Sequence, residues 1–242
     1  MTPEETAAAC AEAVSGIAAG FMLDPATYAA GAEAGFSGLD FYARGRGGAL
    51  GDVDAEQVVD AFAFFEPATV GQNWEACAKV CAGREAAATF IGCGHRWATS
   101  HLGDDVDWHR LAELLGRVIA AGDADAPLFA GWRSMPEPDA ADGKALALHR
   151  LNIAREQRFA AHAAAVRAAG VAPVEAMAVR SPHMAALFGW SELPDVTDDM
   201  RSRWEAAEAD TNRALAGAYG ALDDDERTEL VALCNAALAA VS

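Results

Sequence analysis

The sequence predicts an all-α fold, a compact bundle of about nine or ten helices with no significant sheet. Three observations carry this prediction. Alanine is the commonest residue and β-branched residues are sparse, which favours helix. Helix start and stop signals recur along the chain, and no strand-like alternation of useful length lies between them. With 242 residues, 52% of them hydrophobic, the chain is long enough to bury a substantial core.

The first helices are marked by their caps. Thr2 and Glu5 form a capping box around a proline at the first helical position, and Gly20 is expected to end this helix. Asp24, again followed by proline, begins the second helix. Asp54 begins a third, in the stretch "DVDAEQVVDAFAFF", whose apolar residues recur at helical spacing until Pro67 interrupts it.

The stretch "DFYARGRGGALGD", residues 40–52, combines a tyrosine, two arginines and four glycines. Its glycine spacing matches neither a Walker-type phosphate loop nor a dinucleotide-binding loop. One interpretation is a helix that ends near Arg46, with the glycines in left-handed conformations in a tight exit loop. In the other, Tyr42 and Arg46 share a helix face and point into a pocket, where Arg46 binds an anion.

Further helices are expected at 68–82, 84–100 and 107–121. A connection rich in Pro, Gly and Asp follows at 122–143. It predicts a boundary between an N-terminal part, 1–135, and a C-terminal part, 136–242, which we expect to pack as one unit. Short helices are expected within 172–190, and two acidic helices, 197–219 and 223–241, complete the chain.

The longest helical pattern covers 144–170 and is apolar on nearly every side, which predicts a helix in the middle of the domain. Its polar residues fall on two stripes, His149, Asn152 and Glu156 on one and Arg155, Arg158 and His162 on the other. Buried polar groups must be paired, so one interpretation is a structural salt-bridge network. The other is a polar pocket in which His149 and Glu156 exchange protons with a substrate and Arg155 holds its negative end.

The charge balance argues against two classes of partner. Asp and Glu number 36 against 18 Lys and Arg, a formal net charge of −18, and no basic run occurs. Nucleic-acid affinity comes largely from Lys and Arg, so we expect no nucleic-acid partner and no anionic membrane partner. No apolar run approaches the length of a membrane span, and five cysteines without ligand spacing predict the cytoplasm.

A metal site is an alternative near "CGHRWATSHLGDDVDWH". Cys93, His95, His101 and His109 are ligand types, but their spacing matches no known pattern, so no metal is predicted. No nucleotide or flavin fingerprint is present, so we expect no cofactor.

Four segments together resemble a family of actinobacterial proteins labelled SalK-like or helix-turn-helix proteins. The matching residues are Gly45, Arg46, Leu50 and Gly51; Phe62, Phe65, Pro67 and Val70; His149, Arg155, Glu156, Arg158 and His162; and Gly189, Trp190 and Ser191. The resemblance spans most of the chain and implies a helical fold. Glu66 and Gln157 stand where the family has histidines, and Phe159–Ala161 replace Gly-Asp-Gly. The stretch after Ser191 is too short for a recognition helix and a wing.

Two functional hypotheses follow. The first is a cofactor-independent enzyme of bacterial specialised metabolism that acts on a small, negatively charged molecule. His149 and Glu156 would transfer protons, and the ligand-binding residues would be Tyr42, Arg46, Phe65, Glu66, Asn152, Arg155, His162 and Trp190. The second, which the family label suggests, is a ligand-sensing helix-turn-helix regulator. A scaffold that docks through its acidic C-terminal helices is a third option, and a homodimer is among the expected oligomeric states.

Overall fold

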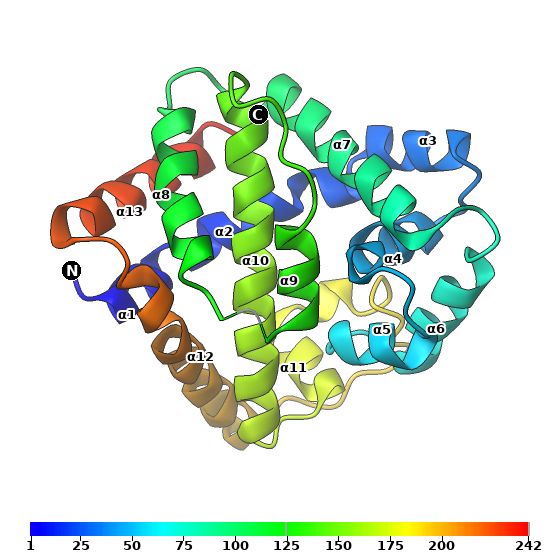
Figure 1. Ribbon diagram of the computed structural model, residues 1–242. Coiled ribbons are helices and arrows are strands. Elements are labelled where there is room, and N and C mark those ends of the chain that lie inside the picture. Colours follow the sequence, from blue (N-terminus) through cyan, green and yellow to red (C-terminus); the bar gives the residue numbers. More distant parts are fainter. Residues whose placement is uncertain (124, 242) are drawn as a thin grey trace.

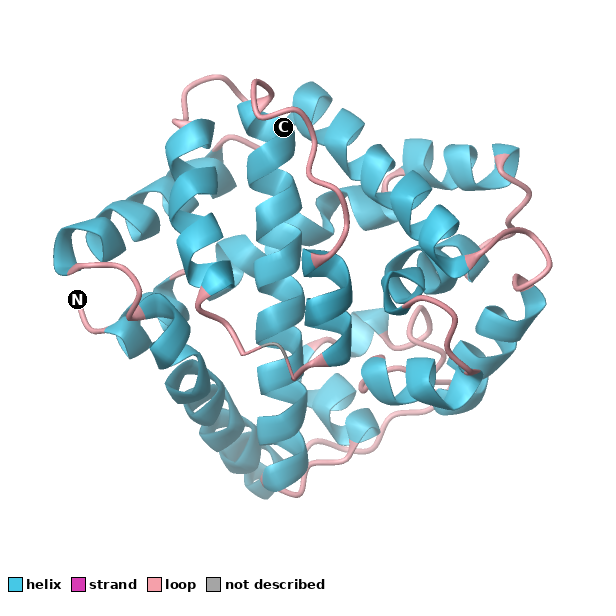
Figure 2. Cartoon of the chain, in the orientation of Figure 1, coloured by secondary structure: helices cyan, strands magenta, loops and turns pink. Residues whose placement is uncertain are grey.

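The computed structural model describes residues 1–123 and 125–241, and helices make up nearly all of its regular structure (Figure 2). Within these residues, β pairing is limited to an isolated bridge between Leu102 and Val241. The all-α prediction is confirmed. In the described part of the chain the α-helices run from α1 to α13, more than the nine or ten expected, because predicted helices are split and an unpredicted one is added.

Figure 1 labels the helices. The N-terminal part contains α1 (Pro3–Ala9), α2 (Ala11–Ala19), η1 (Gly20–Leu23), α3 (Pro25–Glu33), α4 (Asp40–Gly47), η2 (Gly48–Leu50), α5 (Ala55–Ala61), α6 (Pro67–Ala76), α7 (Gly83–His101), α8 (Trp108–Ala120) and α9 (Pro127–Arg133). The C-terminal part contains α10 (Gly143–Ala168), α11 (Pro173–Arg180), η3 (Pro182–Met184), α12 (Asp198–Tyr219) and α13 (Asp224–Ala239).

Two predicted segments differ from the structure. The helix expected to run to Gly20 is divided at Cys10 into α1 and α2, which lets each part follow a different neighbour. The 122–143 connection is no plain linker, because it contains α9, which begins at Pro127 and buries Trp132 to 1% exposure. Pro127 at the first turn of α9 is a helix start signal within this connection.

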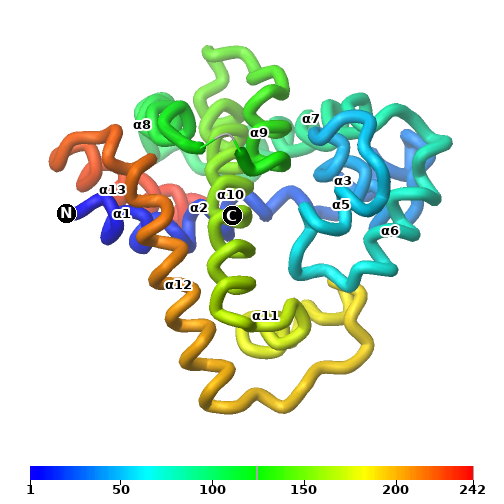
Figure 3. Tube along the Cα trace, turned by 60° about the horizontal axis from the view of Figure 1, so that its bottom comes forward, coloured from blue at the N-terminus to red at the C-terminus, as the bar shows by residue number. Residues whose placement is uncertain are grey.

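Helix α10 runs through the middle of the molecule, as expected from its apolar surface (Figures 1 and 3). It packs against α2, α7, α8, α9 and α12, so elements of the N-terminal part surround a helix of the C-terminal part. The main apolar core reaches from Ala7 in α1 to Ala237 in α13. Helix α4 and the α5–α6 pair lie on one side of α10, and α12 and α13 lie on the other (Figure 1).

The glycines of residues 45–51 bring α4 and η2 close to α7. A Cβ at Gly45 would lie 2.6 Å from the Cβ of Phe90, and one at Gly48 would lie 2.6 Å from the carbonyl carbon of Gly83. Both glycines have ordinary helical conformations, and of this group Gly51 alone has a positive φ, 85°. The predicted left-handed exit loop is therefore wrong except at Gly51. These glycines serve mainly to bring two helices together.

The stretch Pro3–Leu23 has the length and hydropathy of a membrane span, with a mean hydropathy of 1.5, contrary to the expectation that no run approaches that length. Half of it is buried within the protein, and its helices pack against α10, α12 and α13. Buried core helices meet the same criterion, and the break at Cys10 is consistent with a core position.

Candidate functional site

An ion pair between α4 and α10 lies at the centre of the molecule. Arg46 Nε and Nη2 donate to the two carboxylate oxygens of Glu156 at 2.9 and 2.8 Å. Both side chains are 0% exposed. Such a bidentate pair is the geometry in which arginine recognises a carboxylate most specifically. The residue predicted to bind an anion and one of the two predicted to transfer protons therefore bind each other.

A second arginine joins this pair. Arg155 Nη1 donates to Glu156 Oε1 at 2.7 Å, and its side chain is 16% exposed. Burial by itself would raise the pKa of Glu156, but the charges of Arg46 and Arg155 and their hydrogen bonds hold that pKa below its usual range. Glu156 is therefore an ionised carboxylate at neutral pH. Two guanidinium groups and one carboxylate leave this cluster with one excess positive charge.

Aromatic rings enclose the guanidinium of Arg46. Its Cζ lies 4.7 Å from the ring centroid of Phe62 and 4.3 Å from that of Phe159, within the range of cation–π interaction. Trp132 Nε1 donates to the Arg46 carbonyl oxygen at 3.1 Å. Arg46 Nη1 is buried and makes no hydrogen bond to any described residue. Burial lowers the pKa of Arg46, but Glu156 and then Tyr42 raise it above its usual value. Tyr42 and Arg46 share a face of α4, as predicted.

His149 lies on the same stripe of α10 as Glu156, two turns away, but it belongs to a different cluster. Its Nδ1 is 3.2 Å from Nε2 of His95 on α7, and its side chain is buried. Burial, followed by the nearby His95, lowers the pKa of His149 to about 4. Burial also lowers the pKa of His95, which Asp142 partly counteracts. Both imidazoles are therefore neutral at pH 7.

A small cavity borders this histidine pair. The volume open to a water-sized molecule is about 10 Å³. The cavity is lined by His95, His149, Asn152 and apolar side chains of η1, α7, α9 and α10. Asn152 Nδ2 donates to the Leu148 carbonyl at 2.9 Å. His149 Nε2 and Asn152 Oδ1 are buried and have no hydrogen-bond partner in the described part of the chain.

Two of the predicted aromatic walls, Tyr42 and Phe65, lie beneath residues 185–190, which we call the cover segment and which contain the third wall residue, Trp190. The ring of Phe188 stacks on Phe65 with 4.0 Å between centroids, and Phe65 in turn stacks on Tyr42 at 5.7 Å. Trp190 Nε1 donates to the Phe64 carbonyl oxygen at 2.9 Å. Phe188 and Trp190 therefore hold the cover segment against Phe65 and its neighbours.

Glu66 does not join the charged cluster. Its carboxylate caps α6, accepting from the backbone N–H groups of Ala68 and Thr69 at 3.1 and 2.6 Å. The Thr69 side chain, followed by these backbone N–H groups, holds the pKa of Glu66 below its usual range against the opposite effect of burial. The prediction that Glu66 lines the same pocket as Arg46 is thus at odds with the structure. The pattern Glu-Pro is a helix start, and the N-cap position determines where this side chain points.

His162 lies one and a half turns beyond Glu156, in a third cluster. Its Nδ1 is 2.9 Å from Thr211 Oγ1 on α12, and its ring packs on Trp204 and Phe64. Arg158 beside it forms an ion pair with Glu208 at 2.9 Å. Arg158 and His162 therefore connect α10 to α12, and they have no direct contact with the Arg46–Glu156 pair.

The candidate metal ligands are separated. Cys93 contacts Arg96, His95 contacts His149, His101 stacks on Trp97, and His109 Nε2 lies 3.2 Å from the Ala140 carbonyl oxygen. Among the described residues, no three His, Cys, Asp or Glu side chains are grouped so that they could hold a metal ion.

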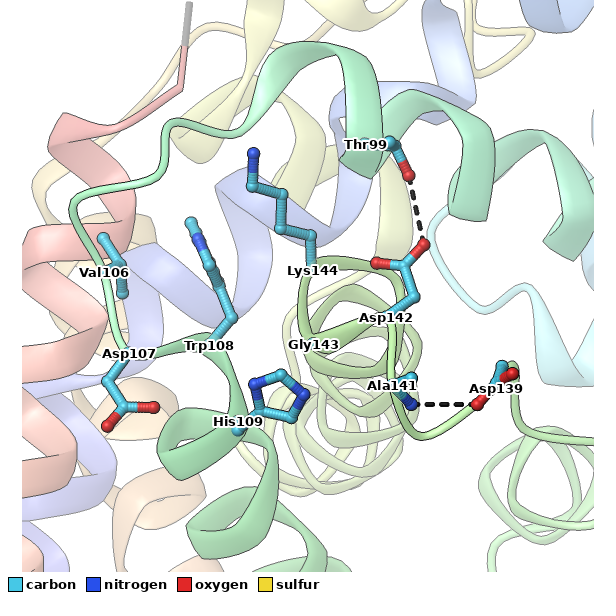
Figure 4. Close-up of a pocket in the computed structure, with 10 residues that line it drawn as sticks. All are labelled: Thr99, Val106, Asp107, Trp108, His109, Asp139, Ala141, Asp142, Gly143 and Lys144. Carbon is cyan, nitrogen blue, oxygen red and sulfur yellow. Dashed lines mark hydrogen bonds between the residues drawn. The ribbon is translucent and has the colours of Figure 1, made fainter.

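An open hollow of about 580 Å³ lies where α7 ends and α8 and α10 begin (Figure 4). Trp108, His109 and Lys144 face it, and Thr99 Oγ1 donates to Asp142 at 3.3 Å across one edge. Lys144 also pairs with Asp104 at 2.6 Å. The hollow is wide and exposed to solvent, and His95 lies one helical turn before Thr99 on α7.

A helix-turn-helix family matches residues 7–193, most of the chain, and this protein belongs to that family. No curated protein and no solved structure matches the chain. The predicted resemblance to helix-turn-helix proteins is thereby confirmed at the level of the family. The family name favours nucleic acid as a partner, in conflict with the expectation from net charge.

Three residues near the site have contacts that the sequence does not predict. The sequence indicates His95 only as a possible metal ligand, places Trp132 in a connection, and shows Phe159 only as a departure from the family's Gly-Asp-Gly. His95 lies within the family-matching region, two residues after Cys93 and two before Trp97, and both of these residues are buried. This position indicates only weakly that the His95 side chain points inwards. Nothing in the local pattern indicates that His95 would meet His149, 54 positions away.

Proposed function

We propose that this protein binds a small organic anion of the carboxylate class along the polar stripe of α10 and acts on it by acid/base chemistry without a cofactor. The excess positive charge of the Arg46–Glu156–Arg155 cluster carries the proposal. A buried ion pair contributes little net stability compared with apolar residues of the same volume. Arg155 adds a positive charge that no carboxylate compensates, and its partial burial costs free energy that a bound anion would offset. This excess positive charge stands out in a molecule whose formal net charge is −18.

The residues take different roles in this proposal. Arg155, which is partly exposed, and the unpartnered Nη1 of Arg46 would hold the carboxylate of the ligand. Glu156 would position the two arginines, because a carboxylate bound by both is a poor proton carrier. His149, with its free Nε2, would transfer the proton. Seven residues at 1.5 Å each separate His149 from Glu156, so the ligand would span roughly 10 Å.

Access would require the cover segment to move, because the cavity beside His149 is too small for an organic acid and the open hollow is not lined by Arg46 or Arg155. Lifting Phe188 from Phe65 would expose Tyr42 and, behind it, Phe62 and Arg46. The cover segment is held mainly by this stack and by two hydrogen bonds to residues 64–66, Trp190 Nε1 to the Phe64 carbonyl and Glu66 N–H to the Phe188 carbonyl. Tyr42, Phe65 and Trp190 would then form the apolar walls of the ligand site.

The test uses 3-phenylpropionate as the probe and its uncharged amide as the matched compound. We expect the carboxylate to raise the melting temperature and the amide to have no effect. A probe at ten times its dissociation constant stabilises the folded state by about 1.4 kcal/mol. Titration followed by calorimetry then gives the affinity.

Arg155→Gln is the informative variant, because Arg155 is only partly buried and its loss leaves the Arg46–Glu156 pair intact. We expect the affinity for the carboxylate to fall about ten- to a hundredfold, the value of a hydrogen bond to a charged group. Arg167→Gln, on the same helix but 69% exposed and paired with Asp60, is the control and should bind as wild type does. Equal binding of acid and amide, or an unchanged affinity in Arg155→Gln, would contradict the proposal.

We also propose that the protein is SalK-like, takes part in actinobacterial specialised metabolism and works in the cytoplasm. The family match supports only membership of a helix-turn-helix family. The five cysteines support the cytoplasm, because all are unpaired thiols in the structure and four of them are buried.

A DNA-binding regulator is the second candidate, and the family match is the observation that favours it. The helix pair α5–α6, joined by residues 62–66, has the connectivity of a helix-turn-helix, but residues 55–76 contain no Lys or Arg. We therefore expect no binding to the DNA upstream of its own gene in a fluorescence-anisotropy titration at about 50 mM salt. Tight binding that weakens steeply with salt would establish the regulator instead, because phosphate contacts release counterions.

A further inference from the structure

His95 lies between the solvent and the buried cavity beside His149. It is half-buried on α7, one turn before Thr99, which faces the open hollow. Its Nε2 contacts His149 Nδ1 at 3.2 Å. His149 also lines the cavity, and its other ring nitrogen, Nε2, is buried without a protein partner in the described structure. The two imidazoles therefore connect a half-buried ring on α7 to a buried ring at the cavity wall.

The size and chemistry of the cavity match a single water molecule. A water needs roughly 10–15 Å³ of such space and two to four polar partners. The cavity offers about 10 Å³. His149 and Asn152 both line the cavity, and each has a buried polar atom, Nε2 and Oδ1, without a partner among the described residues. Leaving both atoms unsatisfied would cost free energy. One water that donates to Asn152 Oδ1 and bonds to His149 Nε2 satisfies both atoms.

We propose that this cavity holds one ordered water molecule bound by His149 Nε2 and Asn152 Oδ1, and that His95 and His149 relay protons between the solvent and that water. The purpose of the relay rests on the proposed acid/base function, whereas the water site does not depend on it. His95 acts through His149 and is a positioning and relay residue, one that no motif in the sequence assigned.

The relay moves one proton per passage. A proton from solvent binds His95 Nδ1, and the proton on His95 Nε2 moves to His149 Nδ1. The proton on His149 Nε2 then passes through the water to a basic group of the ligand, so that no hydronium ion remains in the cavity. Both rings end neutral, with their tautomers exchanged, and they return by the reverse passage or by proton exchange with solvent.

Burial, more than the charged groups around the pair, keeps both rings uncharged at neutral pH, which a two-way relay needs. Asp142 raises the pKa of His95 and Arg96 lowers it, after the larger effect of burial. Around His149, Glu137 raises the pKa and Arg150 lowers it, and burial again has the largest effect.

The experiment is nuclear magnetic resonance on the whole, ligand-free chain with ¹⁵N-labelled histidine. The chain has six histidines, and a His149→Gln spectrum assigns the His149 signals. We expect nuclear Overhauser contacts between water and the His149 ring. In His95→Leu we expect exchange of the His149 ring N–H with solvent to slow about a hundredfold, the lower end of the effect of a positioned proton-transfer group.

His95→Asn repeats the test with a polar side chain that cannot relay, in case His95→Leu is poorly folded. His109→Leu, a histidine of the open hollow that bonds to Ala140, is the matched control and should exchange as wild type does. Absence of the water contact, or unchanged exchange in both His95 variants, would overturn the inference. A relay that works in a protein that binds no carboxylate would leave this inference standing and remove the proposed function.

Discussion

Replacing Glu156 by glutamine is expected to lower the free energy of unfolding by about 3–5 kcal/mol, the cost of leaving a buried charge without its partner. The guanidinium of Arg46 is 0% exposed, so no water can replace the lost carboxylate. The amide of glutamine also turns an N–H group towards the arginine donors. Urea denaturation at pH 7 measures the change. The pKa of Glu156 is lower than usual in the folded state, so its stabilisation is complete at this pH and declines only as the pH falls through about 4 and below.

The matched control is Glu137→Gln. Glu137 also forms a bidentate pair with an arginine of α10, Arg150, but its side chain is 45% exposed. Its loss should cost no more than about 1 kcal/mol. The double variant Arg46→Met/Glu156→Leu removes both charges and should be more stable than Glu156→Gln alone. Equal costs for Glu156→Gln and Glu137→Gln would show that the buried pair is not a structural centre of the fold.

Replacing Gly48 by alanine is expected to destabilise the protein by about 3 kcal/mol, the upper part of the range for overpacking. The added methyl group would overlap the carbonyl group of Gly83 at the start of α7. Backbone atoms cannot turn aside as a side chain can, so η2 and α7 must separate. That movement would also displace α4 and the Arg46 side chain it carries.

Gly217→Ala is the control for this second prediction. Gly217 lies in α12, and an added Cβ there meets nothing within 4 Å. Alanine has the higher helix propensity, so this variant should gain up to about 1 kcal/mol. Thermal melting of both variants compares them directly, and a Gly48→Ala protein as stable as wild type would mean that the two helices are not in close contact.

Much of the helical structure was predictable because its signals are local. The caps at Thr2, Asp24 and Asp54 mark true helix starts, since each side chain bonds a backbone N–H within its own first turn. The central position of α10 followed from its apolar surface. By contrast, the break at Cys10 and the burial of α9 depend on neighbours that are distant in the sequence. The local sequence indicates neither of them.

The candidate site likewise combines features that local sequence patterns predict and features that depend on residues far apart in the sequence. The sequence by itself determined that His149, Asn152 and Glu156 share one stripe of a buried helix and that Tyr42 and Arg46 share a face of another, because helical periodicity relates residues three, four and seven apart. The cap that Glu66 makes on α6 is also local, because the Glu-Pro pattern marks a helix start. Only the tertiary structure decided that Arg46 meets Glu156, 110 positions away, and that His95 meets His149. Those pairings depend on how closely the glycines let α4 approach α7 and on how α10 is surrounded, and neither distance is encoded in the periodicity of a single helix.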